Sequence, residues 1–107
     1  MSNSGDPIFL AMCRQFKLPV PVCELCFAPP RKWRFDYAFF GGVSGGVALE
    51  VNGAVWTRGR HTRGQGYIND MEKMNRAMML NWRVLQVTPD KLRTVATIEY
   101  IRELLRR

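Results

Sequence analysis

Two acidic residues, Asp36 and Glu50, are the side chains best placed to do chemistry in this sequence. Each lies in an otherwise apolar segment, on the face opposite the bulky residues of that segment, because side chains alternate along a strand. If the two segments pair as a hairpin across residues 41–46, both carboxylates project from the same side of the sheet. Neighbouring buried carboxylates are costly unless a cation neutralises them. A hard divalent ion such as Mg²⁺ takes oxygen ligands and fits that need.

An ion held there would support hydrolysis of a phosphodiester, because a bound divalent ion polarises the phosphate and lowers the pKa of an attacking water. The alternative is structural. Both carboxylates can be solvated on an open sheet face, or one can pair with Arg34, which lies in the same segment as Asp36. The residue types alone leave both interpretations open.

Charge supports the first interpretation. The 107 residues carry 16 Lys and Arg against 9 Asp and Glu, a net charge of +7. Such a balance favours a polyanionic partner, with nucleic acid preferred over a membrane surface. No apolar run reaches the roughly 18–20 residues needed to span a bilayer, and the first residues lack the features of a secretory signal. Three cysteines form no closed disulfide framework, which suits a reducing cytoplasm.

The pattern of apolar residues predicts one domain, residues 1–107, in the order α-β-β-β-α-β-α. The expected elements are a helix at 7–17, strands at 22–27, 33–40 and 47–52, a helix at 67–80, a strand at 82–87 and a last helix from Pro89. The passage from 47 to 87 is long enough for a parallel crossover. The predicted fold is therefore α/β, with a mixed four-stranded sheet flanked by helices.

Within the 67–80 helix, four large residues at helical spacing predict the buried face. They are Tyr67, Met71, Met74 and Met78. Lys73 lies well away from the centre of this stripe, so we expect it to be solvated. Asn75 lies closer to the centre and is the polar side chain expected to face inward.

The segment 57–66 carries several basic side chains among three glycines: Arg58, Arg60, His61 and Arg63. We expect a loop whose arginines neutralise flanking DNA phosphates, which makes binding salt-dependent. A neutral His61 near a metal can deprotonate water. In a flexible loop it can equally contact a phosphate, or have no role.

Taken in order, these residues resemble the PD-(D/E)XK nuclease superfamily. The resemblance includes Arg34-Phe35-Asp36, the run ALEVNG at 48–53, Trp56, GRHTRG at 59–64, Glu72-Lys73-x-Asn75 and NWRVL at 81–85. The chain is most similar to small phage and bacterial nucleases of this superfamily. It is more distantly similar to the very-short-patch repair endonucleases, through the x-G-x-x-W element, a downstream histidine and the terminal W-R-V-L strand. The resemblance covers residues 22–92 and implies a restriction-endonuclease-like domain.

The resemblance implies roles by position. Asp36 matches the first metal-binding aspartate, and Glu50 matches the acidic residue of the (D/E)xK strand. Val51 would lend its backbone carbonyl to the metal, which is Mg²⁺ or Mn²⁺. Glu24 matches a further acidic position, and it either completes the metal sphere or lies exposed at a sheet edge.

One position departs from the pattern. Asn52 stands where the superfamily has a lysine, and asparagine supplies no positive charge. Lysine roles migrate in this superfamily, and Lys73 is the obvious substitute. His61 matches a histidine that the repair endonucleases use, and we favour it narrowly over Lys73 because its glycine neighbours let the loop approach the metal. Asn52 and Asn75 are then expected to contact DNA.

The expected function is that of a Mg²⁺-dependent DNA endonuclease. Without a recognition helix, we expect it to recognise a branch, mismatch or nick rather than a base sequence. Its expected setting is the cytoplasm of a bacterium or of a phage-infected host, and a homodimer that cuts two strands is compatible with its size. Two alternatives stay open. One is a catalytically inactive nucleic-acid-binding module that retains the nuclease fold, and the other is a subunit or assembly factor that uses an exposed aromatic face including Trp33.

Overall fold

The computed structural model describes residues 5–41, 45–52 and 65–107 of the chain. The described elements follow the predicted order, with one short 3-10 helix added before the last helix. They are α1 (Pro7–Gln15), β1 (Val22–Cys26), β2 (Arg34–Phe39), β3 (Val47–Val51), α2 (Gln65–Met79), β4 (Arg83–Val87), the 3-10 helix η3 (Pro89–Lys91) and α3 (Val95–Arg106). None of the helices in these ranges is long and apolar enough to cross a membrane.

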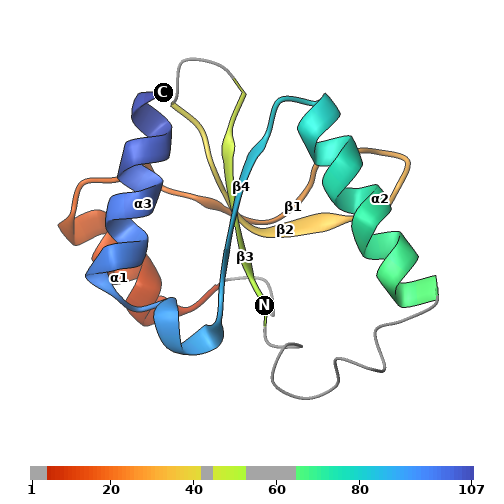
Figure 1. Ribbon diagram of the computed structural model, residues 1–107. Coiled ribbons are helices and arrows are strands. Elements are labelled where there is room, and N and C mark those ends of the chain that lie inside the picture. The colour runs from red at the N-terminus through yellow and green to blue at the C-terminus, as the bar shows by residue number, and fades with distance from the viewer. Residues whose placement is uncertain (1–4, 42–44, 53–64) are drawn as a thin grey trace.

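The four strands form one mixed sheet in the order β1-β2-β3-β4. The pairs β1–β2 and β2–β3 are antiparallel, and β3–β4 is parallel. The chain therefore crosses over from β3 to β4 through α2, as the length of that passage predicted. Figure 1 shows the consequence: α1 and α3 cover one face of the sheet and α2 covers the other.

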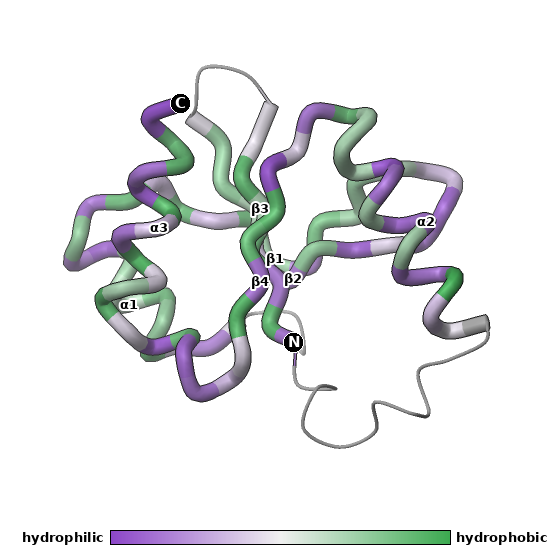
Figure 2. Tube along the Cα trace, viewed as in Figure 1, coloured by the Kyte–Doolittle hydropathy of each residue, from purple (hydrophilic) through white to green (hydrophobic). Residues whose placement is uncertain are grey.

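The core on the α1/α3 face is aromatic and aliphatic. Phe9 from α1 lies 4.8 Å from the ring of Tyr37 and 6.5 Å from that of Phe39. Ile98 and Ile101 of α3 are fully buried in the same cluster. Figure 2 shows the strands as largely hydrophobic where they pass between the helices. Burying these side chains supplies the main favourable term for folding.

On the α2 face the core is smaller and built on stacked rings. Phe27 and Phe35 stack with centroids 3.9 Å apart, and Trp82 meets Phe35 edge-on at 5.0 Å. Gly46 permits this packing, because a Cβ atom there would lie 2.4 Å from the Trp82 ring. The start of β3 is thereby held against the start of β4.

Alternation along residues 33–40 predicts that the bulky residues opposite Asp36, namely Trp33, Phe35, Tyr37 and Phe39, share one face of the sheet, and this prediction is wrong in one respect. Phe35 packs on the α2 face, whereas Tyr37 packs on the α1/α3 face. Strict alternation would put them on the same face. The switch occurs at Asp36, and the partner strand has Glu24 at the same level in the left-handed conformation, with φ of 56°. The two acidic residues therefore lie where both strands exchange faces.

The predicted buried stripe of α2 is also wrong. Tyr67, Met71 and Met78 are exposed, Met78 by 74%, and Asn75 is exposed as well. The side that meets the sheet carries the fully buried Ala77, with Lys73 and Met74 half-buried beside it. The reason is the sheet surface below: small side chains and a carboxylate face α2, and they accept an alanine and a lysine rather than a methionine row.

The last helix begins later than predicted. After η3 the backbone becomes extended at Thr94, whose side chain accepts a hydrogen bond from the Thr97 N–H at 3.3 Å and caps α3. Pro89 therefore begins the 3-10 helix, and Val95 begins α3. A threonine cap satisfies one of the free N–H groups of the new helix, which is why the chain can restart there.

Candidate active site

The centre of the site is the place where the β2–β3 ladder stops. The last paired residues are Tyr37 and Leu49, and beyond them the carboxylates replace backbone partners. The Asp36 N–H donates to Glu50 Oε2 at 3.0 Å, and the Val51 N–H donates to Asp36 Oδ2 at 2.7 Å. Each strand thus binds the acidic side chain of the other, and Asp36 and Glu50 are fixed next to one another.

Lys73 completes this arrangement from α2. Its Nζ lies 2.6 Å from Glu50 Oε1, and the Lys73 and Glu50 side chains are only 15% and 16% exposed. The expectation that Lys73 is solvated is therefore wrong, because α2 is rotated relative to the predicted face. The cation that neutralises Glu50 is Lys73 rather than Arg34, which is exposed at the start of β2.

Burial and the neighbouring groups shift the pKa of Glu50 in opposite directions. Burial raises the pKa of the Glu50 carboxyl above its ordinary value, while the hydrogen bond and the charge of Lys73 act to lower that pKa. The Asp36 N–H also favours the ionised form. Because desolvation is the largest cause, Glu50 depends on its partners to hold a charge at neutral pH.

Two cavities lie on either side of the Asp36–Glu50 pair, and Val51 lines both of them. One, of about 380 Å³, is lined by Asp36 and Glu24 together with Asp6. The other, of about 170 Å³, is lined by Glu50, Lys73, Asn52, Asp70 and Gln86, among others. Glu24 is thus half-buried beside Asp36 rather than exposed at an edge.

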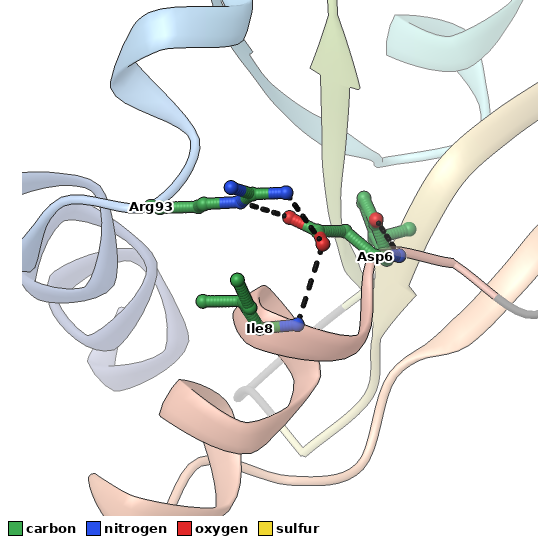
Figure 3. Close-up of polar contacts among 4 residues, drawn as sticks. Asp6, Ile8 and Arg93 are labelled. Atoms are coloured by element: carbon green, nitrogen blue, oxygen red, sulfur yellow. Dashed lines mark hydrogen bonds and ion pairs between the residues drawn. The ribbon is translucent and has the colours of Figure 1, made fainter.

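Asp6 is a further acidic residue at the larger cavity, and it caps the N-terminus of α1. Figure 3 shows its carboxylate between Arg93 and the first turn of α1. Arg93 Nε and Nη2 lie 2.7 and 3.1 Å from its two oxygens, and the Ile8 N–H donates to Oδ1. The hydrogen bond from Arg93 holds the Asp6 pKa below its ordinary value. The Asp6 N–H also donates to the Tyr37 hydroxyl at 2.9 Å, which fixes this segment at the rim of the larger cavity.

The donors in the larger cavity match a hard cation in kind. Asp36 and Glu24 offer carboxylate oxygens, the ligands that Mg²⁺ prefers. The geometry is looser than a finished cage: in the described part of the chain no three His, Cys, Asp or Glu side chains gather closely enough to hold a metal. Glu50 already accepts two hydrogen bonds, although each of its oxygens has a second lone pair. The larger cavity therefore offers oxygen ligands of the kind that Mg²⁺ or Mn²⁺ takes, without the gathered set of side chains that a finished metal centre has.

The remaining predicted site residues are two asparagines, which the structure describes, and the basic-loop residues, which lie outside the described part of the chain. Asn52 lines the smaller cavity, and its N–H donates to the Val87 carbonyl at 2.7 Å. Asn75 is exposed on α2 and is not among the residues that line the two cavities. The basic-loop residues lie outside the described residues: Arg58, Arg60, His61 and Arg63.

Sequence reasoning missed Gln86. It is the register partner of Glu50 in the parallel β3–β4 pair, and its exposed side chain lines the same cavity as Lys73. Asp70 lines that cavity from α2, one turn before Lys73. The alternation of β4 carried a usable signal for Gln86, because it is the polar residue in an otherwise apolar strand core.

Comparisons of the chain with protein-family models, with curated proteins and with solved structures each gave no significant match.

Proposed function

We propose that this chain is a metal-dependent DNA nuclease of the PD-(D/E)XK type, with Asp36, Glu50 and Lys73 as its catalytic residues. The observation that carries the proposal is the contact of Lys73 Nζ with Glu50 Oε1 at 2.6 Å. It gathers two acidic groups and one ammonium group where β2 and β3 separate. Such a set of charges can support hydrolysis of a phosphodiester, and Lys73 supplies the positive charge that asparagine at position 52 cannot supply.

The three residues take different roles. Asp36 and Glu50, with Glu24 and the Val51 carbonyl, would hold Mg²⁺ or Mn²⁺ where the β2–β3 ladder stops. When bound, that ion supplies Lewis-acid polarisation of the phosphate and a more acidic water. Lys73 keeps Glu50 ionised and has further N–H donors that can bind an oxygen of the phosphate. Positive charge placed there stabilises the negative charge that develops in the transition state.

The DNA partner is inferred from charge. The chain has a net charge of +7, and Arg58, Arg60 and Arg63 follow the catalytic strand in the sequence. We assign these arginines to phosphates that flank the scissile bond. Contacts of that kind give affinity without sequence readout, which suits an endonuclease that recognises branched, mismatched or nicked DNA.

One observation favours a second function, that of a catalytically inactive DNA-binding module with this fold. Lys73 neutralises Glu50 directly, and the carboxylate accepts a backbone N–H as well. A closed pair of this kind can take the structural place of a metal. The two functions differ in whether Asp36 has a chemical role.

The test is incubation of the purified chain with plasmid and branched DNA in Mg²⁺, in Mn²⁺ and in EDTA. We expect cleavage only with metal, none by Asp36→Asn, and wild-type cleavage by Glu99→Gln, a matched change on the exposed side of α3. DNA affinity should be nearly equal in all three proteins. Binding without cleavage by the wild type establishes the inactive module, and cleavage by Asp36→Asn contradicts the site assignment.

A further inference from the structure

A separate cavity of about 310 Å³ lies between the β1–β2 connection and the C-terminal half of α2. Its lining includes the apolar residues Phe27, Ala28 and Leu80, with Pro29 and Pro30 beside them. Its volume is at the lower end of the range for small-molecule sites.

Two arginines, Arg31 and Arg76, also line this cavity. The Arg31 guanidinium lies 3.8 Å from the centroid of the Trp33 ring, and Trp33 in turn stacks near Phe27 at 6.4 Å. The connection that carries Arg31 is ordered by its N–H, which donates to the Ala28 carbonyl at 2.9 Å. Cation and aromatic ring are therefore held together at the rim.

The Arg31 guanidinium is available to an anion. Its only ion pair in the described part of the chain is with Glu72 at 3.7 Å, and both side chains are about half exposed. An ion pair so exposed contributes little. A phosphate can therefore replace Glu72 at small cost.

The cavity continues the catalytic site along α2. Lys73, Arg76 and Leu80 follow one another at spacings of three and four residues, which places them in one row on the helix surface. On the sheet, Trp33 lies three residues before Asp36, about 10 Å by the rise of a strand. Arg76 therefore lies about one helical turn beyond Lys73 on the surface of α2.

We propose that this cavity binds an unpaired nucleotide of the DNA strand next to the scissile bond, with its base against the apolar walls and its phosphates on Arg31 and Arg76. The lining favours an unpaired base, because a base in a duplex presents only its edges, whereas an unpaired base can place its face on an apolar or aromatic surface. The substrate class is then DNA with a single-stranded segment beside the cut, such as a flap or branch. The position relative to the cut rests on the proposed nuclease function, and the preference for an unpaired strand does not.

The test measures binding without catalysis. Fluorescence anisotropy with a short fluorescein-labelled oligothymidylate, and with a duplex of equal length, is recorded in EDTA over a range of salt concentrations. We expect tighter binding of the single strand. Arg31→Ala and Arg76→Ala should each lower the slope of log affinity against log salt for the single strand by about 0.7. Arg14→Ala, which removes the same charge from α1 on the opposite face, should leave the slope unchanged.

Equal affinity for single strand and duplex, or equal losses in Arg31→Ala, Arg76→Ala and Arg14→Ala, overturns the inference. Circular dichroism checks that these exposed substitutions leave the fold intact. A chain that passes this binding test but cleaves no DNA in Mg²⁺ or Mn²⁺ contradicts the nuclease proposal and supports the single-strand site. A chain that cleaves DNA but binds the single strand and the duplex equally supports the nuclease proposal and contradicts the single-strand site.

Discussion

Replacing Lys73 by Met isolates the charge at the centre of the site, because methionine keeps most of the aliphatic chain and removes the ammonium group. In the wild type that group lies 2.6 Å from Glu50 Oε1, and both side chains are about 15% exposed. Removing one partner of a buried pair costs about 3–5 kcal/mol, since the other charge is left without compensation. Some solvent reaches Glu50, so we expect the lower end, about 3 kcal/mol at neutral pH.

The cost should depend on pH in a defined direction. Burial already raises the Glu50 pKa above 4.5, and Lys73 opposes that rise. Without Lys73 the folded-state pKa rises further. A group whose pKa is higher in the folded state favours folding below its unfolded pKa, and that contribution is lost as the pH rises through the folded pKa. The deficit of Lys73→Met should therefore be near zero below about pH 4 and grow toward neutral pH.

Urea unfolding followed by circular dichroism, repeated across this pH range, measures the deficit. The double variant Lys73→Met/Glu50→Gln removes both charges and should be less destabilised than the sum of the single variants, by about 1–3 kcal/mol. If Lys73→Met differs from wild type by less than about 0.5 kcal/mol at every pH, Lys73 behaves as a surface residue and the pair is not a feature of the folded protein.

Two further predictions concern the missing strand lysine. If His61 is the general base, His61→Ala should slow cleavage by about 10²–10⁴, and wild-type cleavage should fall below about pH 6.5 as the imidazole is protonated; an unchanged rate and acidic limb in initial-rate assays exclude that role. Asn52→Lys introduced into Lys73→Met should recover part of the lost cleavage, because Asn52 follows the end of β3 and lines the same cavity as Glu50 and Lys73. No recovery, in a double variant that still binds DNA, means that a charge from this strand cannot replace one from α2.

The sheet could be predicted because its signals are local. Alternation in two segments separated by glycines predicts a hairpin, and the length of the passage from β3 to β4 predicts a crossover through a helix. The pairing places Asp36 opposite Glu50, so the Glu50 side chain can accept a hydrogen bond from the Asp36 N–H. The pairing across the sheet needed no knowledge of the helices.

The orientation of α2 could not be predicted in the same way. Helical periodicity locates where apolar side chains gather, which for α2 is the side of Tyr67 and Met71. Which side meets the sheet is decided by the surface below, where Ala48 and Trp82 leave room for Ala77. The inward position of Lys73 follows from the packing of Ala77 against Ala48 and Trp82, and not from the sequence of the helix alone. The Asp6–Arg93 pair is equally invisible to periodicity, because its members are 87 positions apart.

The rotation of α2 connects the fold to the chemistry. Had the predicted stripe faced the sheet, Glu50 would be buried beside methionines with its pKa raised and no ammonium group to oppose it. The observed orientation exposes Met71 and Met78, which is unfavourable, and in return places Lys73 on the carboxylate. Replacing both members of this pair by apolar residues of similar size would cost the fold little, since burying a charge pair is seldom better than burying apolar groups. Both charges lie at the point where the β2–β3 ladder stops. We therefore expect Lys73→Met to lose cleavage although it folds as well as the wild type at pH 4.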